Sequence, residues 1–418
     1  MKDLVLERLH AGARLLARTA RRPTAAAMLC LALMSASTWT SGSTYIEDVS
    51  SSLMGIRKLV GGDSEHYLAI ADSLREGDFG MTHVEPTGAA DRAHRQPGYP
   101  ALLAAAARLG VQRAPDLARL NLALVVLSLW IAWLGTRAAT GSALAGLVAA
   151  AIVYDAGFLF DIATERLLTE PLYVAVSLGA ASAALSYLTR PGAAAMLGAA
   201  VLAGLAYDVR VNGLLLAVSL GVMMVAADLR RGRHADPGAP SAELVLHLPA
   251  AAYAAALALF VVVTVPSWVP RVLHAGNPVY HGYLPNYLWV DDYDRAHMPG
   301  PPRYSLSTYL AEHRAGDAAR RLRWGMQRVF WDTPRDKFGI VASFGLIGAV
   351  VVLVALRNGP GLLLLAAGIL QAMPLAWTAM ANPSRRLSAA ALLPFAALVV
   401  GAAAAALLRR VRPGRNDS

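Results

Sequence analysis

Long apolar runs constrain this sequence more than any other feature. A bilayer core requires roughly 20 apolar residues per helix, with about 17 to 25 as the working range. The chain contains ten runs of near that length, at 24–41, 117–136, 142–160, 171–189, 192–208, 212–228, 246–266, 339–356, 361–379 and 388–408. Only 16% of its residues are charged, whereas soluble domains have about a quarter. The sequence therefore predicts an all-α polytopic membrane protein with about ten transmembrane helices.

One further apolar stretch, "GYPALLAAAARLG" at 98–110, is only about 13 residues long, and this length favours a juxtamembrane helix over a span. Loop charge tests the choice, because Lys and Arg accumulate in short cytoplasmic loops. With 98–110 on the membrane surface, both termini and the basic segment "DLRRGRH" at 228–234 become cytoplasmic. With 98–110 across the membrane, that basic segment would face outward. We therefore expect a multi-pass protein of the cell (inner) membrane with both termini inside.

This topology divides the chain into four parts. Residues 1–23 are expected to be a cytoplasmic amphipathic N-terminus, and 339–418 to hold the C-terminal transmembrane helices and a cytoplasmic tail. Residues 24–266 would be an N-terminal transmembrane module with an outer loop at 42–116, and 267–338 a second large outer loop. Ionisable residues beside membrane spans are costly, so those at the outer edges are candidates for function.

The composition excludes several classes of function. The formal net charge of +10 is explained by basic cytoplasmic loops, and no basic, aromatic-interleaved patch indicates nucleic-acid binding. With Cys30 as the single cysteine, no intrachain disulfide or Cys-based metal site can form. No His-x-x-x-His spacing, P-loop or Gly-x-Ser-x-Gly elbow is present. The acids of "DDYD" at 291–294 are interpreted as solvated loop, with a divalent cation as the alternative.

Several short motifs follow one another on the predicted outer side. They are "GGDSEHY" at 61–67, "RQPGYPALLA" at 95–104, "LLTEPLY" at 167–173, "DVRVNGLLL" at 208–216, "GNPVY" at 276–280 and "RRLSAAALLPFAAL" at 385–398. Their order and spacing resemble the polytopic GT-C glycosyltransferases, especially the branch of protein O-mannosyltransferases and lipid A aminoarabinose transferases (glycosyltransferase family 39-like). The resemblance covers most of the chain. It departs from the family at Gln96, where a second proline is more frequent.

The resemblance implies a membrane glycosyltransferase with its active site on the outer face. Such an enzyme moves a hexosyl or pentosyl group from a polyprenyl-phosphate donor to a lipid, glycan or protein acceptor, with inversion of configuration. Membrane lipids would be further partners. It implies no certain cofactor and leaves room for a divalent cation.

Asp63 can be interpreted in two ways. From the local sequence it follows Gly61 and Gly62 and would be the N-cap of a helix over 64–75. From the resemblance it is the catalytic carboxylate, which accepts the proton of the acceptor hydroxyl. The roles compete, because a carboxylate bonded to backbone amides has a lowered pKa and is a poorer base. Tyr67, one turn further on the same face, would bind sugar or phosphate, or anchor the helix at the interface.

Glu170 is the second carboxylate that the resemblance selects, as a residue that contacts substrate or shapes the site. The local alternative is an acid at a helix start, favourable to the helix dipole. Arg210 and Arg386 are the predicted phosphate ligands, because a guanidinium at a membrane edge can form paired bonds to a lipid phosphate. Arg385 could replace Arg386 in that role.

Four further residues in the same motifs are predicted to bind substrate. Arg95 would pair with a donor phosphate or, alternatively, with a lipid headgroup. Asn212 accompanies Arg210 as the family pattern has it, and Tyr99 and Tyr280 lie in the second and fifth motifs.

Two other classes of function are compatible with a polytopic chain of this kind. A transporter or flippase of lipid-linked glycans would place its site near the bilayer midplane, with charges inside the spans. A non-catalytic envelope assembly protein would tolerate the loss of any one outer charge. The crowding of charges at one membrane edge favours the glycosyltransferase.

Overall fold

The computed structural model describes residues 23–77, 95–235, 248–276, 284–296, 304–382 and 384–411. Within these ranges the regular structure is helical, without strands, as the sequence predicts. The proposed N-terminal amphipathic segment up to residue 22, the last seven residues and Tyr280 lie outside the described residues.

All ten apolar runs form helices. They correspond to α2 (Pro23–Ser50), α6 (Ala114–Thr140), α7 (Ala143–Asp155) with α8 (Gly157–Glu165), α9 (Glu170–Thr189), α10 (Ala193–Val209), α11 (Gly213–Ala235), α12 (Ala250–Ala275), α18 (Ile340–Ala355), α19 (Gly359–Thr378) and α20 (Arg385–Val411). Short helices occupy the two long connections, namely α3 (Leu53–Val60), α4 (Asp63–Arg75), α5 (Gly98–Arg108), α13 (Leu284–Trp289), α14 (Tyr293–Ala296), α15 (Leu306–Glu312), α16 (Ala315–Gln327), η1 (Arg328–Asp332) and α17 (Thr333–Lys337).

The number of clear spans is smaller than the predicted ten. Among the described residues, seven helices are long and apolar enough to cross a membrane, which are α2, α6, α9, α11, α12, α19 and α20. The run 142–160 instead forms the pair α7 and α8, which bend by 53° at their junction and add an eighth span if counted as one. The helices α10 and α18 have 17 and 16 residues, at or just below the length that a bilayer core requires.

Helix ends follow local chemistry. Ser142 and Asn358 accept hydrogen bonds from the first-turn backbone of α7 and α19, which satisfies amides that have no partner within a helix. The α5 helix has only 11 residues, too few to cross a bilayer. It follows that 98–110 does not form a span.

The core of the bundle is built around α20 and α9. In α20, 78% of the apolar window is buried, and in α9 67%. The helix α20 contacts α7, α9, α18 and α19, and its many alanines permit close helix approach. In α2 and α12, by contrast, only 22% and 17% of the window is buried. These two helices therefore lie at the periphery, with surfaces suited to lipid.

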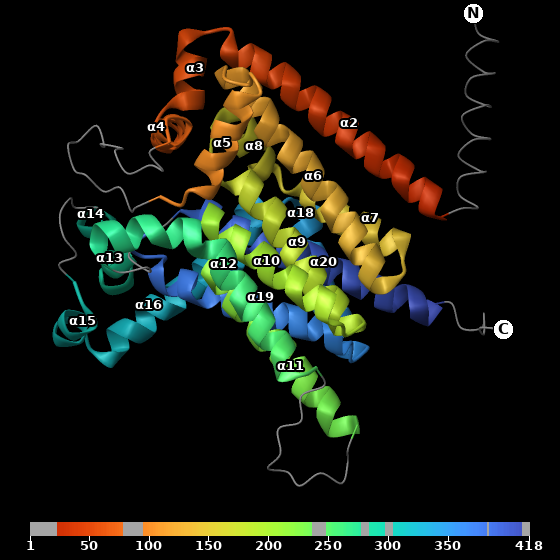
Figure 1. Ribbon diagram of the computed structural model, residues 1–418. Helices are drawn as coiled ribbons and strands as arrows, with labels where there is room; N and C mark the ends of the chain where they lie inside the picture. Colours follow the sequence, from red (N-terminus) through yellow and green to blue (C-terminus); the bar gives the residue numbers. More distant parts are fainter. Residues whose placement is uncertain are drawn as a thin grey trace, which may run out of the picture.

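The short helices gather at one end of the bundle (Figure 1). There α3, α4 and α5 lie near the starts of α6, α9 and α20, while the start of α2 and the end of α20 lie at the opposite end. The two central helices, α9 and α20, both begin at the end that carries the short helices. Their first residues, Glu170 and Arg385, are charged, so the core helices deliver charged side chains to that end.

Candidate active site

Two glycines turn the chain between α3 and α4. Gly62 has a φ of +63°, which L side chains rarely adopt. A Cβ on Gly61 would lie 2.7 Å from the carbonyl oxygen of Arg57. Gly62 is the N-cap, and α4 begins at Asp63 itself, with no side-chain cap hydrogen bond. The interpretation of Asp63 as an N-cap is therefore wrong, because its carboxylate bonds to side chains instead.

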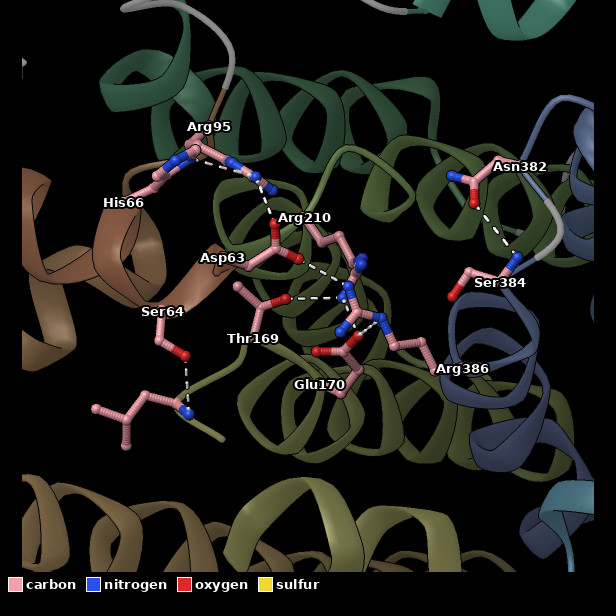
Figure 2. A network of polar contacts seen from close by, with 11 residues as sticks. Asp63, Ser64, His66, Arg95, Thr169, Glu170, Arg210, Asn382, Ser384 and Arg386 are labelled. Carbon is pink, nitrogen blue, oxygen red and sulfur yellow. Dashed lines mark hydrogen bonds and ion pairs between the residues drawn. The ribbon is translucent and has the colours of Figure 1, made fainter. Parts of the chain in front are cut away.

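Asp63 lies between two arginines that are distant in sequence (Figure 2). Arg95 Nη2 donates to Asp63 Oδ1 at 2.7 Å, and Arg386 Nη2 donates to Asp63 Oδ2 at 2.7 Å. Burial acts to raise the pKa of Asp63, but the two guanidinium groups outweigh it and hold this pKa well below its ordinary range. The two arginines therefore engage both oxygens of Asp63 and favour its ionised form.

Glu170 is the first residue of α9, and its side chain is only 1% exposed. Its Oε1 lies 3.0 Å from Arg210 Nη1 and 3.4 Å from Arg386 Nε. Arg210 Nη1 also donates to Thr169 Oγ1 at 2.7 Å. Arg386 thus contacts both predicted carboxylates, and a cluster of Asp63, Arg95, Glu170, Arg210 and Arg386 forms, which we call the charged cluster.

Hydrogen bonds join the two segments that carry the carboxylates. The backbone N–H of Leu167 donates to Ser64 Oγ and to the carbonyl oxygen of Leu59, each at 3.2 Å. Ser64 directly follows Asp63, and Leu167 precedes Glu170 by three residues. These bonds hold the start of α4 against the approach to α9. Neither Ser64 nor Thr169 was selected from the sequence, although each is the immediate neighbour of a selected acid.

Two predicted tyrosines pack beside the charged cluster. The Tyr67 ring lies edge-on to Tyr99, with centroids 5.4 Å apart, and the Arg95 guanidinium lies 5.4 Å from the Tyr67 centroid. Tyr99 is fully buried, and its hydroxyl donates to Asn121 Oδ1 at 3.0 Å. Burial raises the pKa of Tyr99 far above its ordinary value. Tyr67 therefore packs against Arg95, and the buried Tyr99 packs against Tyr67.

The remaining predicted residues, Asn212, Tyr280 and Arg385, are not members of the charged cluster. Asn212 lies in the turn between α10 and α11, two residues after Arg210. Tyr280 is outside the described residues. Arg385 pairs with Asp336 rather than with either carboxylate of the charged cluster. The structure therefore separates Arg385 from Arg386, which the sequence alone could not do.

A cavity adjoins the charged cluster and shares Arg386 with it. Its volume is about 160 Å³, and its lining consists of Phe158, Asp161, Ile162, Glu165, Arg166, Leu168, Lys337 and Arg386. Within the charged cluster itself, three arginines face two carboxylates, which leaves one surplus positive charge. Such an arrangement can bind an anion beside an ionised carboxylate.

The segment at 291–294 is only partly as predicted. Asp292 and Asp294 are exposed, but Asp291 is not a solvated loop residue. Its carboxylate lies 2.8 Å from Nη1 of the fully buried Arg321 and 3.2 Å from His313 Nε2. Within the described ranges, no three His, Cys, Asp or Glu side chains converge as metal ligands.

Comparison with known proteins adds one structural similarity. No protein-family model matches the chain, and no curated protein sequence matches it. Among solved structures, it is similar to the archaeal oligosaccharyltransferase AglB from Archaeoglobus fulgidus, determined in complex with an inhibitory peptide and a dolichol-phosphate. The identity is 15% and the TM-score 0.47, over 92% of this chain and 52% of that protein. The chain thus spans about half the length of this neighbour.

Proposed function

We propose that the protein is a membrane glycosyltransferase of the cell envelope. It transfers a sugar from a polyprenyl-phosphate donor to a lipid, glycan or protein acceptor on the outer face of the cell membrane. The observation that carries this proposal is the convergence of Asp63, Glu170 and three arginines from separate segments, at the end of an apolar helix bundle. A lipid phosphate with an apolar tail matches both the surplus positive charge and the surrounding apolar helices.

In the proposed reaction, Arg210 and Arg386 bind the donor phosphate, with Arg95 as a third cation. The acceptor hydroxyl attacks the anomeric carbon from the face opposite the phosphate, and Asp63 accepts its proton. The bond between the anomeric carbon and the phosphate oxygen breaks. Its electron pair leaves with the polyprenyl phosphate, and the configuration is inverted. Glu170 holds the two phosphate-binding arginines in place.

The ion pairs of Asp63 bear on its role as a base. A carboxylate held by two guanidinium groups is a weak proton acceptor, because its pKa is depressed. The phosphate of the donor competes for the same arginines, so donor binding weakens their attraction for Asp63. The pKa of Asp63 then rises toward its ordinary value when the donor is in place. The carboxylate becomes a better base only in the complex that can react.

The test is transfer of label from a polyprenyl-phosphate sugar to an extract of candidate acceptors. Asp63→Asn keeps the size of the side chain and removes the base, so turnover is expected to fall by about 10²–10⁴. Asp72→Asn is the matched control, because Asp72 is exposed on the same helix and its carboxylate pairs with Arg75, three residues further on. Thermal stability and donor affinity are measured in parallel.

Two outcomes would count against this proposal. If the wild-type protein transfers no label from any polyprenyl-phosphate sugar, the proposed activity is wrong. If Asp63→Asn keeps more than about a tenth of wild-type turnover, less than the loss of a general base implies, Asp63 is not the base and Glu170 becomes the next candidate.

A further inference from the structure

A second polar network lies buried beside the charged cluster, and the proposed reaction does not use it. Its centre is Arg271 near the end of α12, which is only 2% exposed. Arg271 Nη1 donates to the hydroxyl of Tyr207 at 2.9 Å, and Nη2 donates to Gln96 Oε1. The guanidinium also lies 5.8 Å from the centroid of the Tyr207 ring. A buried charge is costly unless it is paired and hydrogen-bonded, so these contacts indicate a defined position for Arg271.

The network extends to the last turn of α10. Ser267, one turn before Arg271 on α12, donates to Asp208 Oδ1 at 2.5 Å. Asp208 is 7% exposed, and it attracts Arg271 electrostatically. The neighbouring residues Tyr207 and Asp208 are therefore both tied to α12, one through Arg271 and one through Ser267. These contacts fix the end of α10, where Arg210 follows two residues later.

The network also fixes the segment that begins with Arg95. Gln96 is 6% exposed, and its side chain accepts the hydrogen bond from Arg271. Two residues later, a Cβ on Gly98 would lie 2.7 Å from the carbonyl oxygen of Asp208. The backbone at 95–98 thus lies directly against the end of α10, an approach that only glycine permits at this position.

Arg271 therefore connects the two segments that carry Arg95 and Arg210 of the charged cluster. Through Gln96 it holds the residue next to Arg95, which pairs with Asp63. Through Tyr207 it holds the helix end that presents Arg210, which pairs with Glu170. We propose that Arg271 is a positioning residue that sets the spacing between Arg95 and Arg210. Its contribution to catalysis rests on the proposed function, whereas its contribution to geometry does not.

The first test measures geometry without any substrate. In Arg271→Met, amide hydrogen exchange is expected to accelerate both at 98–104 and at 209–214, because the first segment loses its tie to α12 and the second loses one of its two ties, keeping only that from Ser267 to Asp208. Gln96→Leu is expected to accelerate exchange at 98–104 only. Gln96→Glu keeps an acceptor for Arg271 and should leave both segments as in the wild type. If Arg271→Met does not fold, Arg271→Lys and Gln96→Leu carry the same test.

The second test measures the proposed reaction. A misplacement of about 1 Å can cost about 10²-fold in rate, so Arg271→Met should lower kcat by about that factor. The double variant with Gln96→Leu should lose little more than Arg271→Met alone, because the two residues act through one contact. Gln96→Glu should restore most of the rate that Gln96→Leu loses. A merely structural role would not give this rescue.

Arg231→Met is the matched control. Arg231 also lies over a tyrosine ring, at 5.3 Å from Tyr187, and donates to the backbone of Leu188, but it belongs to the far part of α11. This variant should lower thermal stability without changing exchange at 98–104 or kcat. Unchanged exchange in both segments of Arg271→Met would overturn the positioning role. Accelerated exchange with an inactive wild type would instead leave that role intact and reject the proposed function.

Discussion

At the scale of single residues, the charged cluster is unusual in how its charges are shared. Arg386 contacts Asp63 and Glu170 at once, so removal of one side chain changes the surroundings of both acids. Each carboxylate also has an arginine of its own, Arg95 or Arg210. The five side chains therefore form one connected unit, and we expect their contributions to the proposed binding and turnover not to be additive.

The affinity for the donor phosphate is expected to depend on Arg386. Arg386→Ala removes a charge-assisted contact worth about 1.5–3 kcal/mol, or roughly 10- to 150-fold in affinity. Arg386→Lys should restore only part of it, because a point charge cannot form the bidentate fork. The measurement is equilibrium binding of a radiolabelled polyprenyl phosphate. Arg385→Ala is the adjacent control, since Arg385 pairs with Asp336. Loss of affinity in Arg385→Ala but not in Arg386→Ala would place the phosphate elsewhere.

The acidic limb of the pH profile of kcat/KM is expected to depend on Arg95. The folded pKa of Asp63 is lowered, so its ion pairs stabilise the fold above the unfolded pKa of about 4, and this stabilisation is lost as pH falls through the folded value. For the wild type, kcat/KM should therefore show no acidic limb from Asp63 above about pH 5. Arg95→Gln removes one cation, so the pKa of Asp63 should rise and the limb move to higher pH. An identical profile in both proteins would show that Asp63 does not control it.

At the scale of helices, local sequence predicts the elements well and their ends less well. Each apolar run is helical because an apolar segment in a bilayer must satisfy its backbone hydrogen bonds internally. The break between α7 and α8 at Ala156 was missed, although Asp155 and Gly157 flank it and interrupt the apolar run. The start of α4 was placed one residue late, because Asp63 is a good N-cap by type and only the positive φ of Gly62 decides otherwise.

The five members of the charged cluster were selected from the sequence, but their pairings were not predictable. Motif order selected Asp63 and Arg386, yet the contact between them joins residues 323 apart in the chain. The network of Arg271 with Gln96 spans 175 residues, and Arg271 was not selected from the sequence. Similarly, the acids at 291–294 appeared solvated because nothing local indicates that Arg321 is buried against Asp291.

The turn before α4 provides a test at this scale. Gly62→Ala places a Cβ on a residue with a φ of +63°, which should cost about 1–3 kcal/mol of stability or displace Asp63. Turnover should then fall more than thermal stability alone explains. Gly157→Ala at the start of α8 is the control, because a Cβ there meets nothing within 4 Å. The comparison uses thermal unfolding in detergent together with kcat. If both variants lower thermal stability and kcat equally, the turn at Gly62 does not position Asp63.

At the scale of the whole molecule, the two ends of the bundle differ in the charged residues they carry. The charged cluster lies at the end that carries the short helices, where α9 begins. Since α9 is long enough to cross the membrane, Arg190 after its last residue lies at the opposite end. Arg137 near the end of α6 and the arginines at 409 and 410 in the last turn of α20 follow the same pattern. From the positive-inside rule we expect that opposite end to be cytoplasmic.

Cysteine labelling in intact cells tests this orientation. Cys30 is exposed and is first replaced by Ala. Cysteines at Ser51 and Glu76, both exposed beside the short helices, should react with an impermeant thiol reagent. A cysteine at the exposed Pro191, between α9 and α10, should react only after the membrane is permeabilised. The reverse pattern would place the charged cluster on the cytoplasmic side. The charged cluster would then be accessible to soluble nucleotide sugars. Its location would no longer be a reason to expect a polyprenyl-phosphate donor.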